Sequence, residues 1–115
     1  MTEVYDMIEG IILGGKPIGL LKEKGAEKIL ASLVSFCRNK DYSETKEVIQ
    51  ILEIVKQKII SEAISLKMEN IEKMLEDLSM LDRFFWEKNP SLEFGRIDVE
   101  ILSELQALKI KKAKK

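Results

Sequence analysis

Apolar residues recur every three or four positions along most of this chain, the spacing that places side chains on one face of an α-helix. No segment alternates apolar and polar residues in the way that a half-buried β-strand does. The pattern therefore predicts an all-α fold built from six helical segments. We expect these segments over residues 2–13, 17–25, 26–38, 43–67 and 70–86, and a sixth from Asp98 that could continue into the lysine-rich end.

Residues that cap or break helices stand at the boundaries of these segments. Thr2, Ser43 and Asn70 can each cap a helix N-terminus through a side-chain oxygen. The Gly14–Gly15 pair and Pro90 both disfavour helical continuation. The positions of these residues support the division that the apolar spacing predicts.

The segment over residues 43–67 is the longest, and its apolar residues fall on more than one side. One stripe comprises Val48, Ile51, Leu52, Val55, Ile59, Ala63 and Leu66. A second comprises Ile49, Ile60 and Ile64. A helix that is apolar on more than one side usually lies at the centre of a fold or in a subunit interface. We therefore predict a compact antiparallel bundle of about five or six helices with a long central helix over residues 43–67.

The length of 115 residues suits one domain with a hydrophobic core of its own. The sequence shows neither an internal repeat nor a linker between domains. From Lys109 to Lys115 it carries five Lys and no acidic residue, so the end of the chain has little to bury. We predict a single helical domain over residues 1–110 and a flexible lysine-rich tail over residues 111–115.

The amino-acid composition indicates the kind of environment in which this protein folds. Hydrophobic residues make up 45% of the chain and charged residues 34%, which is typical of a folded protein. Lys, Glu and Ile are abundant while Asn and Gln are few, which resembles the composition of thermophile proteins. The single cysteine, Cys37, fits a reducing compartment. Because we see neither a signal peptide nor an apolar run of about 20 residues, we expect a cytoplasmic protein without a membrane partner.

The residue types themselves exclude most catalytic and metal sites. His is absent, so the chain has no Ser–His or Cys–His pair and no imidazole ligand. One cysteine cannot build a thiolate zinc site, and Cys37 shares an apolar face with Leu33 and Val34, which favours a buried residue over a reactive thiol. Carboxylates lie beside the apolar stripes, as on a solvated face. We predict no enzyme, catalytic residue, cofactor, metal or small-molecule substrate.

Three adjacent aromatic residues, Phe84, Phe85 and Trp86, cannot all lie on one face of a helix. Phe85 continues the main apolar stripe of its segment, whereas Phe84 forms a second patch with Met80. Phe84 and Trp86 could pack beneath the apolar residues of 91–97, or they could lie in an interface, where Trp is enriched. Both placements stay open from the sequence.

These aromatics and the second stripe of the long helix together supply the candidates for a protein interface. The candidate side chains are Met80, Phe84, Trp86, Ile49, Ile60 and Ile64.

A short motif overlaps the aromatics. Leu81 is followed three residues later by the adjacent pair Phe84 and Phe85. This spacing resembles the sliding-clamp-binding peptide of replication proteins, in which a Gln stands three residues before the aliphatic position. Leu78 occupies the Gln position here. The resemblance implies a clamp-binding role, whereas the apolar stripe explains Leu81 and Phe85 more simply as core residues.

The lysine-rich end suggests a different partner. Basic tails attract phosphate backbones by releasing counterions, without reading sequence. A solubilising helix end is the alternative explanation. The candidate contacts to nucleic acid are Lys109, Lys111, Lys112, Lys114 and Lys115.

Two classes of function therefore follow from the sequence. The first is a non-enzymatic helical interaction or assembly protein that binds itself or another protein, as a homo-oligomer or as a small subunit of a larger complex. The alternative is a nucleic-acid-associated helical subunit of a nucleoprotein complex that uses the lysine-rich C-terminus. Clamp binding is a third role.

Overall fold

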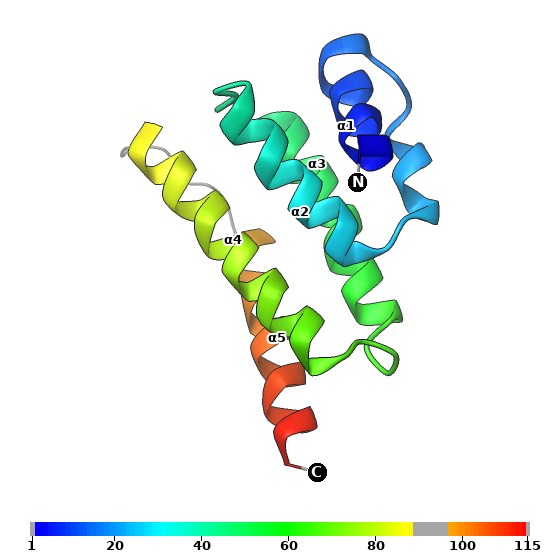
Figure 1. The fold of residues 1–115 in the computed structure, drawn as a ribbon, viewed down its shortest axis with the longest axis vertical. Coiled ribbons are helices and arrows are strands. Elements are labelled where there is room, and N and C mark those ends of the chain that lie inside the picture. The colour runs from blue at the N-terminus through cyan, green and yellow to red at the C-terminus, as the bar shows by residue number, and fades with distance from the viewer. Residues whose placement is uncertain (1, 89–96, 115) are drawn as a thin grey trace.

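The computed structural model describes residues 2–88 and 97–114, and the side chains of all of these except residues 2, 97 and 98. In these ranges every regular element is a helix and no strand occurs, which confirms the predicted all-α fold. The described residues form five α-helices and one 3-10 helix (Figure 1). The elements are α1 (Thr2–Gly14), η1 (Ile18–Glu23), α2 (Ala26–Asn39), α3 (Thr45–Ser61), α4 (Met68–Lys88) and α5 (Ile97–Ala113).

Helix α2 is the centre of the bundle, because it packs against α1, α3 and α4. Figure 1 shows α2 and α3 between α1 on one side and α4 and α5 on the other. Helix α5 packs against α3 and α4 and closes the bundle. The buried residues of α2 are Ala26, Ile29, Leu30, Ser32, Leu33, Val34, Phe36 and Cys37.

The helix predicted over residues 43–67 lies inside the bundle, where α3 packs against α2, α5 and η1, but it is shorter than predicted. Helix α3 ends at Ser61, and the longest helix is α4, with 21 residues. The Ser61 and Ser65 hydroxyls donate to the backbone carbonyls of Lys58 and Glu62, at 3.1 and 3.0 Å. Serine side chains that bond nearby backbone groups compete with helical hydrogen bonding. The turn that results directs Leu66 into the core.

Other predicted boundaries lie within a few residues of those observed. Gly15 adopts a φ of +68° directly after α1, the left-handed conformation in which glycine ends helices. Helix α4 begins at Met68, so Asn70 does not cap it, and Glu44 rather than Ser43 precedes α3. Pro90 lies outside the described residues, as does the side chain of Thr2.

One hydrophobic core joins all six elements. At its α1 end, the Phe36 ring lies between Tyr5 and Tyr42, with centroids 6.0 and 5.5 Å away. Two polar residues, Ser32 and Asp77, are buried as well. Within the described residues, no helix is both long and apolar enough to cross a membrane.

The C-terminal lysines are partly ordered as helix. Helix α5 continues through Ala113, so Lys111 and Lys112 belong to its last turn. This placement extends the helix beyond residue 110, the point at which the sequence pattern placed the end of the domain.

Candidate functional site

Two adjoining hollows lie between α2 and α4. The larger, of about 420 Å³, is lined by Ala31, Val34, Ser35, Arg38, Asn39, Lys73, Asp77 and Met80. The smaller, of about 180 Å³, is lined by Arg38, Met80, Arg83, Phe84 and Glu87. Because Arg38 and Met80 line both, the two form one continuous surface, which we call the α2–α4 groove.

The sequence of α4 creates this groove by carrying two separate helical stripes. The first enters the core and comprises Ile71, Met74, Leu78, Leu81 and Phe85. The second runs along the groove and comprises Lys73, Asp77, Met80, Phe84 and Glu87. Both stripes alternate steps of three and four residues, which keeps each on one side of the helix.

Asp77 is the buried polar group of the groove. Its side chain is only 4% exposed, and Oδ1 accepts a hydrogen bond from Lys73 Nζ at 2.9 Å. That hydrogen bond raises the pKa of the Lys73 ammonium above its usual value. The other oxygen, Oδ2, is buried without a hydrogen-bond partner among the described residues. A buried acceptor left in this state costs about 1–3 kcal/mol.

Sequence reasoning missed Asp77. The available signal was its spacing, since Asp77 stands three residues before Met80 and seven before Phe84, on the same side of the helix.

Met80 and Phe84, two of the predicted interface residues, are brought together in the groove. Phe84 is half-buried and meets the Phe85 ring edge to face, with centroids 5.5 Å apart. Lys88 Nζ lies over the Phe84 ring, 5.6 Å from its centroid, and forms an ion pair with Asp41. The Phe84 ring is therefore held in place at the edge of the groove.

Trp86 does not join this group. Two residues of helix turn the chain by about 200°, so Trp86 lies on a different side of α4 from Phe84. Its side chain is 62% exposed, which excludes a core position for it among the described residues. Residues 91–96, which the sequence offered as a cover for it, lie outside the described residues.

The three isoleucines predicted as a second stripe on one helix are separated by the end of α3. Ile49 lies on α3, is half-buried and packs against the core. Ile60 is 46% exposed and Ile64, in the turn after α3, is 95% exposed. Ile60 and Ile64 are therefore the more exposed part of the predicted stripe.

Ile64 lies beside the C-terminal lysines. A hollow of about 180 Å³ is lined by Ala63, Ile64, Leu108, Lys111 and Lys112. Lys112 Nζ donates to the Ile64 carbonyl oxygen at 3.4 Å, which ties α5 to the α3–α4 turn. Lys109, Lys111 and Lys114 are exposed, and Lys115 lies outside the described residues.

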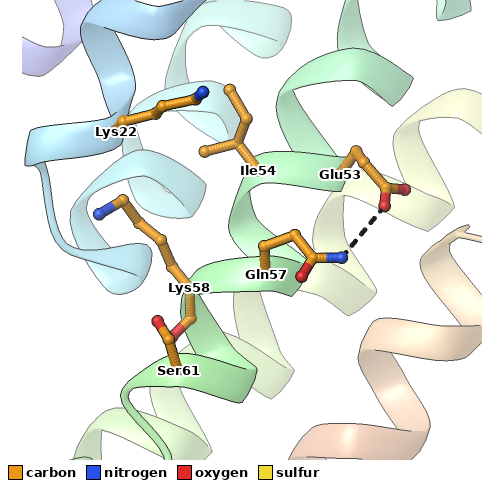
Figure 2. Close-up of a pocket in the computed structure, with 6 residues that line it drawn as sticks. All are labelled: Lys22, Glu53, Ile54, Gln57, Lys58 and Ser61. Atoms are coloured by element: carbon orange, nitrogen blue, oxygen red, sulfur yellow. Dashed lines mark hydrogen bonds between the residues drawn. The ribbon is translucent and has the colours of Figure 1, made fainter.

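Another hollow, of about 360 Å³, lies between η1 and α3 (Figure 2). Figure 2 shows the Lys22 and Lys58 side chains on the η1 side, whereas Glu53 is directed to the opposite side. Gln57 Nε2 donates to Glu53 Oε1 at 3.4 Å. Lys22, Glu53 and Gln57 are all exposed, so none is a buried group that needs a ligand.

The described residues contain no group of three side chains that could hold a metal ion. Cys37 is fully buried, as predicted, and desolvation raises the pKa of its thiol to about 12. Leu81 and Phe85, two positions of the clamp-binding resemblance, lie in the core. A clamp could reach them only if α4 left the bundle, so we do not carry this role further.

Comparison of the chain with protein-family models, curated proteins and solved structures finds no match.

Proposed function

We propose that this chain is a non-enzymatic helical assembly protein that acts by binding protein, either a second copy or a larger complex. The α2–α4 groove carries the proposal. It combines the apolar side chains of Met80 and Phe84, charged groups at the rim and the buried oxygen of Asp77 that lacks a donor. An apolar centre, a charged rim and an enrichment in Met, Arg and aromatic residues are typical of protein interfaces.

Apolar side chains elsewhere on the surface support the same function. Ile64 and Trp86 are largely exposed, and Leu13 on α1 is exposed as well. Covering exposed apolar side chains with a partner stabilises the complex by about 25 cal/mol for each Å² of apolar surface removed from water. Trp contributes strongly when it becomes buried in an interface.

Sedimentation velocity from about 1 to about 100 µM tests this proposal, a range that detects micromolar association. We expect a mass of at least twice that of the 13.2 kDa chain, rising with concentration. If the chain instead stays monomeric, it should be recovered from its native cell in a stoichiometric complex. A monomer that also purifies alone from its native cell would contradict the proposal.

Nucleic-acid binding is a second candidate, favoured by the helical ordering of the C-terminal lysines. Lys109, Lys111 and Lys112 lie on the last turns of α5, and Lys114 directly follows the helix. Lys112 contacts the α3–α4 turn. A basic helix end of this kind can bind phosphates without reading sequence.

Fluorescence anisotropy with labelled DNA and RNA distinguishes this candidate. We expect affinity to fall by about tenfold or more between 50 and 200 mM salt if about four phosphates are contacted. A chain truncated after Ile110 should lose most of this binding, while Lys46→Ala, at an exposed lysine on α3, should bind as the native chain does. Unchanged anisotropy at low salt would remove nucleic acid as a partner.

A further inference from the structure

We propose that a second copy of this chain covers the α2–α4 groove, in a two-fold symmetric dimer whose axis passes beside Met80. This inference rests on the proposed function and names its partner. It is carried by the order of charges along α4.

Charged residues of α4 stand at equal distances before and after Met80. In each such pair, the residue before Met80 and the residue after it carry opposite charges. Lys73 stands seven residues before Met80, and Glu87 stands seven residues after it. Asp77 stands three residues before Met80, and Arg83 stands three residues after it. All five line the groove.

A two-fold axis at Met80 makes this pattern self-complementary. It places a second α4 antiparallel to the first, so residues at equal distances before and after Met80 lie level with each other across the interface. Lys73 then faces Glu87 of the second copy, because seven residues make nearly two full turns and keep both close to the direction of Met80. Asp77 lies level with Arg83 of the second copy. Each contact occurs twice, and Met80 meets Met80 at the centre.

The geometry of the helix keeps these pairs in register. At 1.5 Å per residue, the Lys73 and Glu87 positions lie about 10 Å on either side of the axis, and the Asp77 and Arg83 positions about 5 Å. Both pairs therefore fall within the length of the groove. Opposite charges therefore lie level with each other at about 5 Å and at about 10 Å from the axis. An antiparallel pairing in this register is favoured over one in which the second helix is shifted along the first.

The arginines of the groove are available to a partner. Arg38 and Arg83 line the smaller hollow, and neither forms an ion pair or a side-chain hydrogen bond within the described ranges. In the dimer, Arg83 lies level with Asp77 of the second copy. The opposite charges of these two side chains favour this alignment.

Mixed charge argues for a second copy over a peptide of one sign. An acidic segment along the whole groove would bring its carboxylates against Asp77 and Glu87. A basic segment would meet Lys73, Arg38 and Arg83. The second copy carries the complementary alternation by symmetry, so it avoids both repulsions.

Charge exchange between two variants tests this arrangement. In Lys73→Glu, Glu would face Glu87 of the second copy, and in Glu87→Lys, Lys would face Lys73. We expect each variant alone to dimerise at least about tenfold more weakly than the native chain. An equimolar mixture should recover dimers, because in the mixed dimer both pairs again join opposite charges.

Glu87→Lys is the cleaner of the two variants, because Lys73→Glu also removes the ion pair between Lys73 and Asp77 within one chain. Thermal unfolding followed by circular dichroism establishes that both variants are folded before they are mixed. The matched control is Asp82→Lys, an exposed position on the opposite side of α4. This control should dimerise as the native chain does.

Disulfide cross-linking tests whether the two-fold axis passes beside residue 80. A cysteine introduced as Met80→Cys would face its own copy, so oxidation should give covalent dimers. The native Cys37 is buried and its thiol pKa is raised to about 12, so it should not compete. Asp82→Cys, on the opposite side of α4, should remain uncross-linked under the same conditions.

The outcomes separate this inference from the proposed function. If the native chain associates but the mixture does not recover dimers and Met80→Cys does not cross-link, the inference is wrong and another surface carries the assembly. If the native chain is monomeric at every concentration, the dimer is excluded, while recovery in a complex from the native cell would still support an assembly function.

Discussion

Phe36→Ala should lower the free energy of unfolding by about 3–5 kcal/mol, because the substitution leaves a cavity where a large ring is fully buried. The Phe36 ring also contacts the rings of Tyr5 and Tyr42, and such pairs add about 0.5–1.5 kcal/mol beyond burial. Domains of this size are stable by about 5–15 kcal/mol. Urea unfolding followed by circular dichroism measures the loss.

Two controls show whether the loss comes from packing at this position. Phe36→Leu keeps most of the volume and should cost clearly less than Phe36→Ala. Leu13→Ala removes a largely exposed side chain and should change stability by about 0.5 kcal/mol or less. A loss of under about 1 kcal/mol for Phe36→Ala would mean that its ring does not join α1 to α2.

Phe85→Ala should be nearly as damaging, at about 3–5 kcal/mol, although both of its neighbours in the sequence are aromatic as well. Phe85 is fully enclosed in the core, whereas Trp86 is mostly exposed. Trp86→Ala should therefore change the stability of the monomer by about 0.5 kcal/mol or less. Urea unfolding at low protein concentration measures both, because association would otherwise add to the apparent stability.

Phe84→Ala provides the intermediate case. Its ring is half-buried between Phe85 and Lys88, so its loss should fall between those of the two neighbours. Equal losses for Phe85→Ala and Trp86→Ala would show that α4 is rotated relative to the core. Phe84→Ala should in addition weaken the proposed dimer, which Trp86→Ala should leave unchanged.

Phe84, Phe85 and Trp86 also show which side-chain positions a sequence pattern can predict. Helical periodicity alone assigned Phe85 to the core, because it continues a stripe that begins at Ile71. It could not decide between core and interface for Phe84 and Trp86. That decision depends on where α2 lies beside α4, and the sequence of α4 carries no information about its neighbour.

At the end of α3, the same periodicity predicts more helix than the structure contains. Apolar spacing continues through Ile60 and Ile64, so the pattern alone predicts a helix to residue 67. The chain instead turns after Ser61 and returns at Leu66, which is buried, while Ile64 is left in solvent. Serine hydroxyls at both ends of the turn bond the backbone, a competition whose outcome tertiary packing decides.

The sequence by itself determined the all-α class and the core stripes, because helix periodicity and burial of apolar faces are local properties. It also identified Met80 and Phe84 as a patch outside the main stripe. Only the tertiary structure placed α2 at the centre, joined Ile64 to the lysines of α5 and buried Asp77 beside Lys73. A carboxylate in the sequence gives no sign of burial, because its exposure depends on which helix packs against it.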